Sequence, residues 1–163
     1  MNLINELYKN EISCPKPIIN KYGNIINKCA GKHATIVSLL DGETAQFTNL
    51  KRCSQIGAML AKLHLATSKI ALTRANPLGP DSWLTILMET DDSNTNLPET
   101  LKHQAIAQIK EIISDWPTSL PNGVIHGDLF PNNAMFVGDT LTGIIDFYFA
   151  CTGFFAYDLA ICL

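Results

Sequence analysis

One decapeptide constrains the fold of this 163-residue chain more than any other stretch. Residues 124–133 read VIHGDLFPNN, and they place three polar side chains of different chemistry, His126, Asp128 and Asn133, on a short loop that contains a proline. Asp and Asn also cap backbone groups in ordinary tight turns, which is the plain structural interpretation of such a loop. The residues that follow favour a chemical role instead.

The residues after this loop predict a β-hairpin. Two apolar segments, residues 134–137 and 141–145, flank the turn residues at 138–140. Because the second strand of a hairpin runs back alongside the first, we expect Asp146 to return to the loop that holds Asp128 and Asn133. The polar side chains would then meet in one place.

These residue types suit phosphoryl transfer, which asks a protein mainly for positioning and charge neutralisation. The Asp128 carboxylate could orient an attacking hydroxyl and accept its proton. The Asn133 amide oxygen and the Asp146 carboxylate are hard oxygen ligands of the kind that Mg²⁺ prefers, and they could hold the ion against nucleotide phosphates. The spacing therefore predicts a kinase-like site that uses a nucleotide and Mg²⁺.

Composition argues against several other function classes. Hydrophobic residues make up 47% of the chain and charged residues 17%, which is typical of one soluble globular domain. The formal charge of −3 and the lack of any Lys/Arg cluster disfavour nucleic-acid binding. No apolar run reaches the ~18 residues of a membrane span, and the N-terminus lacks the pattern of a secretory signal, so we expect a cytoplasmic protein.

The cysteines and one Gly-Lys pair predict no further site. The five cysteines are odd in number and include no Cys-x-x-Cys pair, so we expect reduced thiols in the core. Gly31-Lys32 does not fit a phosphate-binding Walker loop, because residue 26 is isoleucine and residue 33 is histidine. We expect Lys32 to be an ordinary surface lysine.

Periodicity and turn residues predict the remaining elements. Expected helices lie at residues 3–9, 50–67 and 98–116 and from residue 156 onward, and expected short strands at 25–26 and 34–40. Segments 74–83 and 91–96 are rich in loop-forming residues and are expected to be loops, with Trp83 as an anchor.

Two other polar side chains have a plain structural interpretation. His64 lies beside the apolar stripe of the helix expected at 50–67, so we expect a packed or surface histidine, not a ligand. Arg74 could meet an anionic group of a substrate, but a structural salt bridge is the default expectation.

The spacing His-x-Asp-x-x-x-x-Asn, with Ile-Asp-Phe after a hairpin, resembles the catalytic segment of the aminoglycoside phosphotransferase and choline kinase group. Longer runs resemble, more closely, the bacterial homoserine kinases of the phosphotransferase-like type, and this resemblance covers essentially the entire chain. The runs are SCPKPI (13–18), GKHATIVS (31–38), LHLA (63–66), RANPLGP (74–80), GVIHGDLFPNN (123–133), IDFYFAC (145–151) and YDLAICL (157–163).

The resemblance implies an α+β, protein-kinase-like fold that is present in part. Residues 1–42 would be a remnant of the N-terminal lobe sheet with the hinge, and residues 43–163 the helical lobe with the catalytic loop. The implied reaction is ATP-dependent phosphorylation of the homoserine hydroxyl, a step toward threonine. Homoserine, as a small-molecule substrate, comes from the resemblance alone.

The same resemblance implies roles for the loop residues. Asp128 would be the catalytic base or hydroxyl-orienting group, and His126 a structural member of the catalytic loop. Asn133 and Asp146 would be the Mg²⁺ ligands.

Three further residues receive roles in the same way. Asp158 would support the catalytic loop by hydrogen bonding, although a helix N-terminal cap explains an aspartate there nearly as well. Ser38 and Leu40 would lie in the hinge, where backbone groups meet the adenine of ATP.

The chain also departs from the family pattern. Family members normally begin with a turn over the phosphates and a strand lysine, and continue with several further helices, so this sequence is expected to be the middle of a kinase. The alternatives are a non-catalytic remnant or binding module, a kinase of another small alcohol such as choline or an aminoglycoside, or a chain that works with a complementing chain. An incomplete domain would expose apolar surface that the absent parts normally cover, so association or poor solubility is expected.

Overall fold

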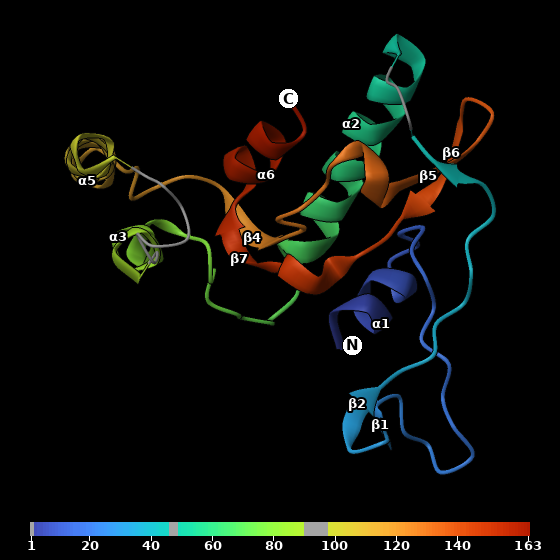
Figure 1. Cartoon of the computed structure of the whole chain (residues 1–163). Coiled ribbons are helices and arrows are strands. Elements are labelled where there is room, and N and C mark those ends of the chain that lie inside the picture. The colour runs from blue at the N-terminus through green and yellow to red at the C-terminus, as the bar shows by residue number, and fades with distance from the viewer. Residues whose placement is uncertain (1, 46–48, 90–97) are drawn as a thin grey trace. The chain divides into compact units, whose positions relative to one another are not determined.

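The computed structural model describes residues 2–45, 49–89 and 98–163. The elements, in chain order, are α1 (Asn2–Lys9), β1 (Asn27–Cys29), β2 (Lys32–Ala34), β3 (Glu43–Thr44), α2 (Leu50–Thr67), α3 (Pro80–Glu89), α5 (Glu99–Ser114), β4 (Asn122–Ile125), η1 (Pro131–Asn133), β5 (Ala134–Val137), β6 (Thr140–Ile144), η2 (Phe147–Phe149), β7 (Cys151–Phe154) and α6 (Phe155–Ile161) (Figure 1). Helices mixed with small antiparallel sheets confirm the predicted α+β class.

The chain forms two compact units, Met1–Ala75 with Pro121–Leu163, and Asn76–Leu120. The lobe boundary predicted at residue 42 is not one of these divisions and stays a prediction. Over the described residues, no helix combines the length and the apolar character that crossing a membrane requires.

The smaller unit contains α3 and α5. Trp83 anchors it as predicted, because its ring meets Trp116 edge-on at 5.2 Å and its indole N–H donates to the Leu78 carbonyl at 2.7 Å. The loop predicted for residues 74–83 is wrong at its end, since α3 begins at Pro80. A proline is tolerated in a first helical turn, and Asp81 beside it favours a helix start. The loop predicted at 91–96 lies outside the described residues.

The core of the larger unit lies where α1 and α2 pack together with the strands. Fully or nearly buried side chains fill it: Leu7, Ile12, Cys14, Leu60, Leu63, Leu129 and Ile144. Ile56 and Met59 pack against this cluster, so the apolar stripe predicted on the helix at 50–67 is confirmed. α2 also contacts β4, which leads into residues 126–133, and β6, which leads to Asp146.

Two antiparallel sheets carry the predicted hairpin and its surroundings. β5 and β6 pair from Ala134 with Ile144 to Val137 with Thr140, which confirms the hairpin. β3 extends this sheet along β5, and a separate sheet pairs β4 with β7, so that Ile125 lies opposite Cys151. Residues just before and just after the catalytic segments are therefore hydrogen-bonded neighbours.

The strands predicted at 25–26 and 34–40 are displaced. The observed hairpin is β1 with β2, and its turn contains Ala30 and Gly31, which both have positive φ. This turn sets where the strands lie. The apolar run at 34–40 contributes Ala34 to β2 and an isolated bridge between Pro17 and Val37, beside which Ile36 accepts from the Ile18 N–H. Two apolar side chains of that run, Ile36 and Leu39, are 70% and 93% exposed.

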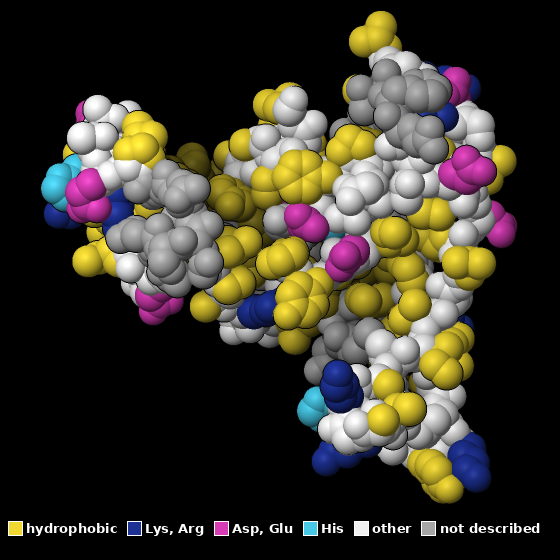
Figure 2. All heavy atoms as spheres, in the orientation of Figure 1, with side chains coloured by type: hydrophobic (Ala, Val, Ile, Leu, Met, Phe, Trp, Pro, Cys, Tyr) yellow, Lys and Arg dark blue, Asp and Glu magenta, His cyan; other side chains and the backbone are white. Residues whose placement is uncertain are grey.

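The expectation of exposed apolar surface is thus confirmed for residues 18–39. Figure 2 shows hydrophobic side chains at the surface beside the β1–β2 hairpin. Lys32 is exposed as predicted. The expectation of buried thiols holds for Cys14 and Cys151 but is wrong for Cys29 and Cys53, which are exposed.

Candidate active site

The loop after β4 is closed by a hydrogen bond between two of its predicted site residues. The Asn133 side-chain amide donates to the Asp128 carbonyl at 2.7 Å and to the Asp128 carboxylate at 3.0 Å. The proline-containing turn η1 lies between them and carries Asn133 back toward Asp128. Because the amide nitrogen faces Asp128, the amide oxygen faces the other way and is the atom left for a ligand.

A fully buried carboxylate holds the start of this loop. Asp158 accepts the backbone N–H groups of His126 at 3.0 Å and Gly127 at 2.9 Å, and the His64 ring lies 2.9 Å from the same carboxylate. Asp158 lies inside α6 and not at its N-cap, which is Phe154. The predicted supporting role is therefore confirmed, and the alternative of a helix cap is wrong.

These contacts decide the charge of Asp158. Burial alone would raise its pKa, but the hydrogen bonds from His64, Gly127 and His126 outweigh burial and hold the pKa below its ordinary value. The carboxylate therefore stays ionised and keeps accepting from the loop.

Gly127 is required for this geometry. Its φ is +76°, in the left-handed region that favours glycine, and an added Cβ would lie 2.9 Å from the Phe149 carbonyl oxygen. The loop can therefore turn tightly against the segment after Asp146 only with glycine at this position.

His126 is a fully buried member of the loop. Its Nε2 lies 2.9 Å from the Ile145 carbonyl oxygen, and since a carbonyl only accepts, Nε2 carries the proton. Burial lowers the pKa of His126, so the ring is neutral near pH 7, and its Nδ1 has no hydrogen-bond partner among the described residues. Because the His126 ring is fully buried, it contacts other protein groups and not a substrate, which fits a structural role.

Asp146 returns to the loop at the end of β6. The residue before it, Ile145, donates its N–H to the Asn133 carbonyl at 2.9 Å while its own carbonyl meets His126. Asp146 itself has φ +62°, and its carboxylate accepts from the Tyr148 N–H at 3.3 Å. Hydrogen bonds to two loop residues therefore bring Asp146 beside the loop, as the hairpin predicted.

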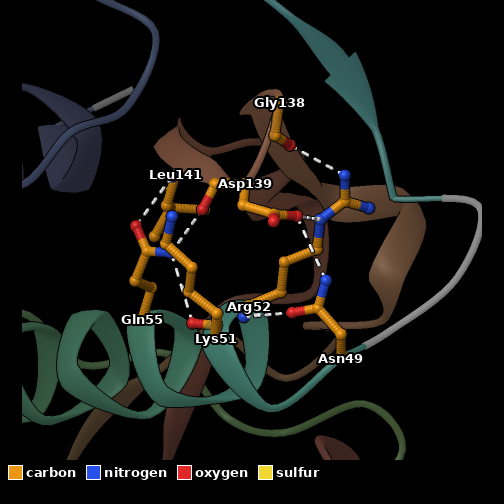
Figure 3. A network of polar contacts seen from close by, with 7 residues as sticks. All are labelled: Asn49, Lys51, Arg52, Gln55, Gly138, Asp139 and Leu141. Atoms are coloured by element: carbon orange, nitrogen blue, oxygen red, sulfur yellow. Dashed lines mark hydrogen bonds and ion pairs between the residues drawn. The ribbon is translucent and has the colours of Figure 1, made fainter.

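The tip of the same hairpin is tied to the start of α2 (Figure 3). Arg52 lies 3.1 Å from the Asp139 carboxylate and donates to the Gly138 carbonyl at 2.7 Å. Asn49 donates to the same carboxylate at 3.1 Å, and Gln55 donates to the Asp139 carbonyl at 2.5 Å. Hydrogen bonding from Asn49, helped by Arg52, lowers the pKa of Asp139. The strands that carry Asn133 and Asp146 are thereby fixed at their far end too.

The oxygen donors present fit a Mg²⁺ ion that is shared with phosphates. Asn133 and Asp146 offer an amide and a carboxylate oxygen, and proteins usually bind Mg²⁺ through one or two carboxylates together with substrate phosphates. Among the described residues, no group of three or more His, Cys, Asp or Glu side chains could enclose a metal ion. Asn133 and Asp146 thus offer donors of the kind that fit Mg²⁺ shared with a nucleotide, and their role as its ligands stays a prediction.

The two predicted hinge residues lie apart from these contacts. The Ser38 N–H donates to the Lys16 carbonyl at 2.8 Å, and the Ser38 hydroxyl accepts from the Lys16 N–H at 2.9 Å. The Leu40 side chain lies against Gly143 of β6. Their contact with adenine stays a prediction.

Arg74 and His64 differ from their sequence-based expectations in different ways. The salt bridge expected for Arg74 is wrong: its guanidinium donates to the carbonyls of Tyr148 at 2.5 Å and Ala150 at 3.1 Å, and it forms no ion pair within the described residues. His64 is packed as expected, stacked on Phe155 at 4.3 Å, but its contact with Asp158 was missed. Its partner lies 94 residues away, so no local pattern could reveal the pair.

Comparison with known proteins agrees with this geometry. The whole chain, residues 1–163, matches the family described as the phosphotransferase enzyme family. The chain belongs to this family. Its relatives include the homoserine kinases of Afipia carboxidovorans, 40% identical, and Parvibaculum lavamentivorans, 41% identical, each over 163 residues. These alignments cover 100% of this chain but 50% and 51% of the relatives, so the chain spans about half their length.

Solved structures confirm the kinase-like phosphotransferase fold. An amicoumacin kinase in complex with AMP-PNP and Ca²⁺ matches with a TM-score of 0.76 at 16% identity, over 99% of this chain and 50% of that one. An aminoglycoside phosphotransferase of Streptomyces rimosus in complex with ADP and streptomycin matches with a TM-score of 0.67 at 18% identity, over 99% of this chain and 63% of that one. At such identities the likeness concerns the fold alone.

Proposed function

We propose that this chain carries the catalytic segment of an ATP-dependent homoserine kinase. The observation that carries the proposal is the joining of Asp128, Asn133 and the Asp146 turn by hydrogen bonds of 3.0 and 2.9 Å. Identity of about 40% to homoserine kinases over the full chain favours homoserine as the acceptor. The reaction would be a cytoplasmic step toward threonine.

In the proposed reaction the homoserine hydroxyl oxygen attacks the γ-phosphorus of ATP. Asp128 orients this hydroxyl and takes its proton as the new P–O bond forms and the bond to ADP breaks. Asn133 and Asp146 would hold Mg²⁺, which when bound would neutralise charge on the phosphates. Two proteins of the same fold, solved in complex with AMP-PNP and with ADP, support the use of a nucleotide.

Four other residues would position the loop or the nucleotide. Asp158 and His126 keep the loop and the Asp146 turn in register through their hydrogen bonds. Ser38 and Leu40 would lie where the adenine meets backbone groups of the hinge. The last assignment follows from the family resemblance.

The proposal is tested with the full chain, ATP, Mg²⁺ and homoserine, with phosphohomoserine followed by ³¹P NMR. Asp128→Asn should lower the rate by about 10²–10⁴-fold, because it removes the proton acceptor while keeping the shape. Asp81→Asn, a change at the start of α3, is the matched control and should leave the rate unchanged. Equal rates for Asp128→Asn and the unaltered chain would make the catalytic assignment wrong.

The metal assignment has a separate test. Replacing both Asn133 and Asp146 with Ala should abolish Mg²⁺-dependent binding of ATP, measured by calorimetry with and without Mg²⁺. Unaltered binding would move the ion elsewhere. Choline and an aminoglycoside serve as competing acceptors in the activity assay, and faster turnover of either would replace homoserine as the substrate.

A second candidate is a chain that acts only together with a complementing chain, or as a non-catalytic binding module. The exposed side chains of Ile36 and Leu39 favour it, because apolar surface of this kind is commonly covered by a partner. An inactive chain that becomes active on adding a partner would support complementation. A chain that binds the partner without any turnover would support the binding module.

A further inference from the structure

An open pocket of about 340 Å³ lies beside the turn that follows Asp146. Its walls come from α1, from residues 72–74, from β4 and from residues 147–150, all within the larger unit. Most of the lining is apolar and includes Leu72, Val124 and Phe147. Figure 2 shows hydrophobic side chains gathered over β4 and β7 on the face that it displays. The volume is near the lower end for pockets that hold small ligands, about 300–1,000 Å³.

One cation, Arg74, lines this pocket and is held in place by the backbone. Its Nη1 donates to the carbonyls of Tyr148 and Ala150, and its own N–H donates to the Thr152 hydroxyl at 3.1 Å. Residues 73–74 run beside β7, since the Thr152 N–H donates to the Arg74 carbonyl at 2.7 Å. The guanidinium is therefore preorganised.

The bonds to the two carbonyls use only one nitrogen of Arg74. The side chain is exposed, and no carboxylate of the described residues pairs with it. The edge formed by Nε and Nη2 is one that binds a carboxylate through two parallel hydrogen bonds. Arg74 thus combines a fixed position with an unused carboxylate-binding edge.

The chemistry of the pocket points to one class of ligand. A cation at the rim of an apolar lining suits a short aliphatic chain that ends in a carboxylate. The positive charge acts on the surroundings as well, because burial raises the pKa of Cys151 and Arg74 opposes that rise. Inorganic phosphate would satisfy the cation but leave the apolar walls without contact.

We propose that this pocket binds a small aliphatic carboxylate such as an amino acid, with the carboxylate on Arg74 and the aliphatic chain against Leu72, Val124 and Phe147. The ligand could be homoserine itself, an interpretation that rests on the proposed function, or another small amino acid that acts as an effector. Phe147 directly follows Asp146 and contacts the His126 ring at 4.6 Å, so an occupied pocket is coupled to the catalytic loop.

The test is binding to the full chain with ¹³C-labelled methyl groups, read at Leu72, Val124 and Ala150 by NMR. Titration with 2-aminobutyrate should shift these methyl signals saturably. Propylamine, the same molecule without its carboxylate, should not shift them, and neither should inorganic phosphate. Absent shifts, or equal shifts with propylamine or phosphate, would overturn the proposal.

Two variants test the pocket independently, one by removing the cation and one by filling the space. Arg74→Gln should weaken 2-aminobutyrate binding about tenfold or more, since it removes a bidentate ionic contact. Thr73→Phe places a ring in the pocket from an exposed position and leaves Arg74 and its carbonyl contacts in place, so it should abolish the shifts even if Arg74→Gln perturbs folding. Lys69→Gln, which removes a charge outside this pocket, is the matched control. Unchanged affinity in either Arg74→Gln or Thr73→Phe, for a folded chain, would show that the ligand binds elsewhere.

Homoserine and a non-substrate amino acid separate the two sources of ligand. If homoserine shifts the same methyl signals and 2-aminobutyrate inhibits turnover competitively, the pocket receives the substrate. If 2-aminobutyrate binds without such competition, the pocket is an effector site. Both outcomes support the proposal. Binding needs no phosphoryl transfer, so a failure here leaves the kinase assignment standing, and a failure of the kinase assay leaves this test valid.

Discussion

Residues 124–158 and residues 15–40 belong to the same compact unit but are built in opposite ways. In the first region the buried polar side chains are hydrogen-bonded, apart from Nδ1 of His126: Asp158 accepts two loop N–H groups and a histidine, and Asn133 bonds to Asp128. In the second region, the β1–β2 hairpin is exposed on nearly all of its residues, and apolar side chains such as Leu39 face solvent.

The difference shows which region of the chain is held in a single arrangement. Buried hydrogen bonds allow few alternative arrangements, because each unmatched group carries a desolvation cost. A two-stranded hairpin that buries neither face is only marginally stable by itself. We therefore expect the catalytic segments to tolerate little change and residues 15–40 to tolerate much.

The largest expected effect concerns Asp158. Asp158→Ala leaves the N–H groups of His126 and Gly127 buried without an acceptor, so the free energy of unfolding should fall by about 3 kcal/mol. Urea denaturation gives this value, and hydrogen exchange at the Gly127 amide should accelerate. Asp139→Ala, in the exposed turn network, is the comparison variant and should cost less. A smaller loss for Asp158→Ala than for Asp139→Ala would reverse our ranking of the two sites.

Lowering the pH should remove the stability that the Asp158 carboxylate contributes. Since the folded-state pKa of Asp158 is held below its ordinary value, its contribution to stability is complete above about pH 4 and is lost as the pH falls through the folded pKa.

The second-largest loss of stability is expected at Gly143, where β6 contacts Ser13 and Leu40. Gly143 of β6 approaches the Ser13 carbonyl, and an added Cβ would lie 2.6 Å from that oxygen and 2.7 Å from Leu40. Gly143→Ala should therefore lower the free energy of unfolding by about 2 kcal/mol, as overpacking does. Gly57→Ala is the matched control, because nothing lies within 4 Å of a Cβ there in α2, and it should stabilise by about 0.5–1 kcal/mol. Equal effects of the two substitutions would show that this contact is not tightly packed.

The third effect depends on pH and concerns His126. Burial lowers its pKa in the folded state, so the unfolded chain binds the proton more readily as the pH falls below about 6.5. The free energy of unfolding should therefore fall with decreasing pH from about 6.5 downward, with a slope of up to about 1.4 kcal/mol per pH unit. His126→Gln, which keeps a donor for Ile145, should remove this part of the slope. Denaturation curves between pH 5 and pH 8 compare the two proteins, and identical slopes would contradict the assignment.

The smallest effect on stability is expected at Leu39. Its side chain is 93% exposed, so Leu39→Ser should change the free energy of unfolding by no more than about 0.5 kcal/mol. The same change should reduce self-association, because it removes apolar surface from solvent. Sedimentation velocity at several concentrations measures it. A loss of more than about 1 kcal/mol would mean that residues 15–40 pack more like the catalytic region than we describe.

The sequence predicted the site better than it predicted the surrounding strands. The spacing of Asp128, Asn133 and Asp146 sufficed because a tight loop and a short hairpin are local structures whose turn residues are written in the chain. The strands near residues 25–40 were misplaced because an apolar run looks the same whether it is paired or exposed. The start of α3 was missed because prolines and a glycine outweighed the helix-starting pattern at Pro80 and Asp81.

By itself, then, the sequence determined the loop with Asp128 and Asn133, the hairpin that returns Asp146 and the family to which the chain belongs. Tertiary structure decided how these groups are held. The partners of Asp158 come from residues 64 and 126–127, and Arg74 meets the carbonyls of residues 148 and 150. Such contacts join positions that are tens of residues apart, and local propensity carries no information about them until the backbone has brought them together.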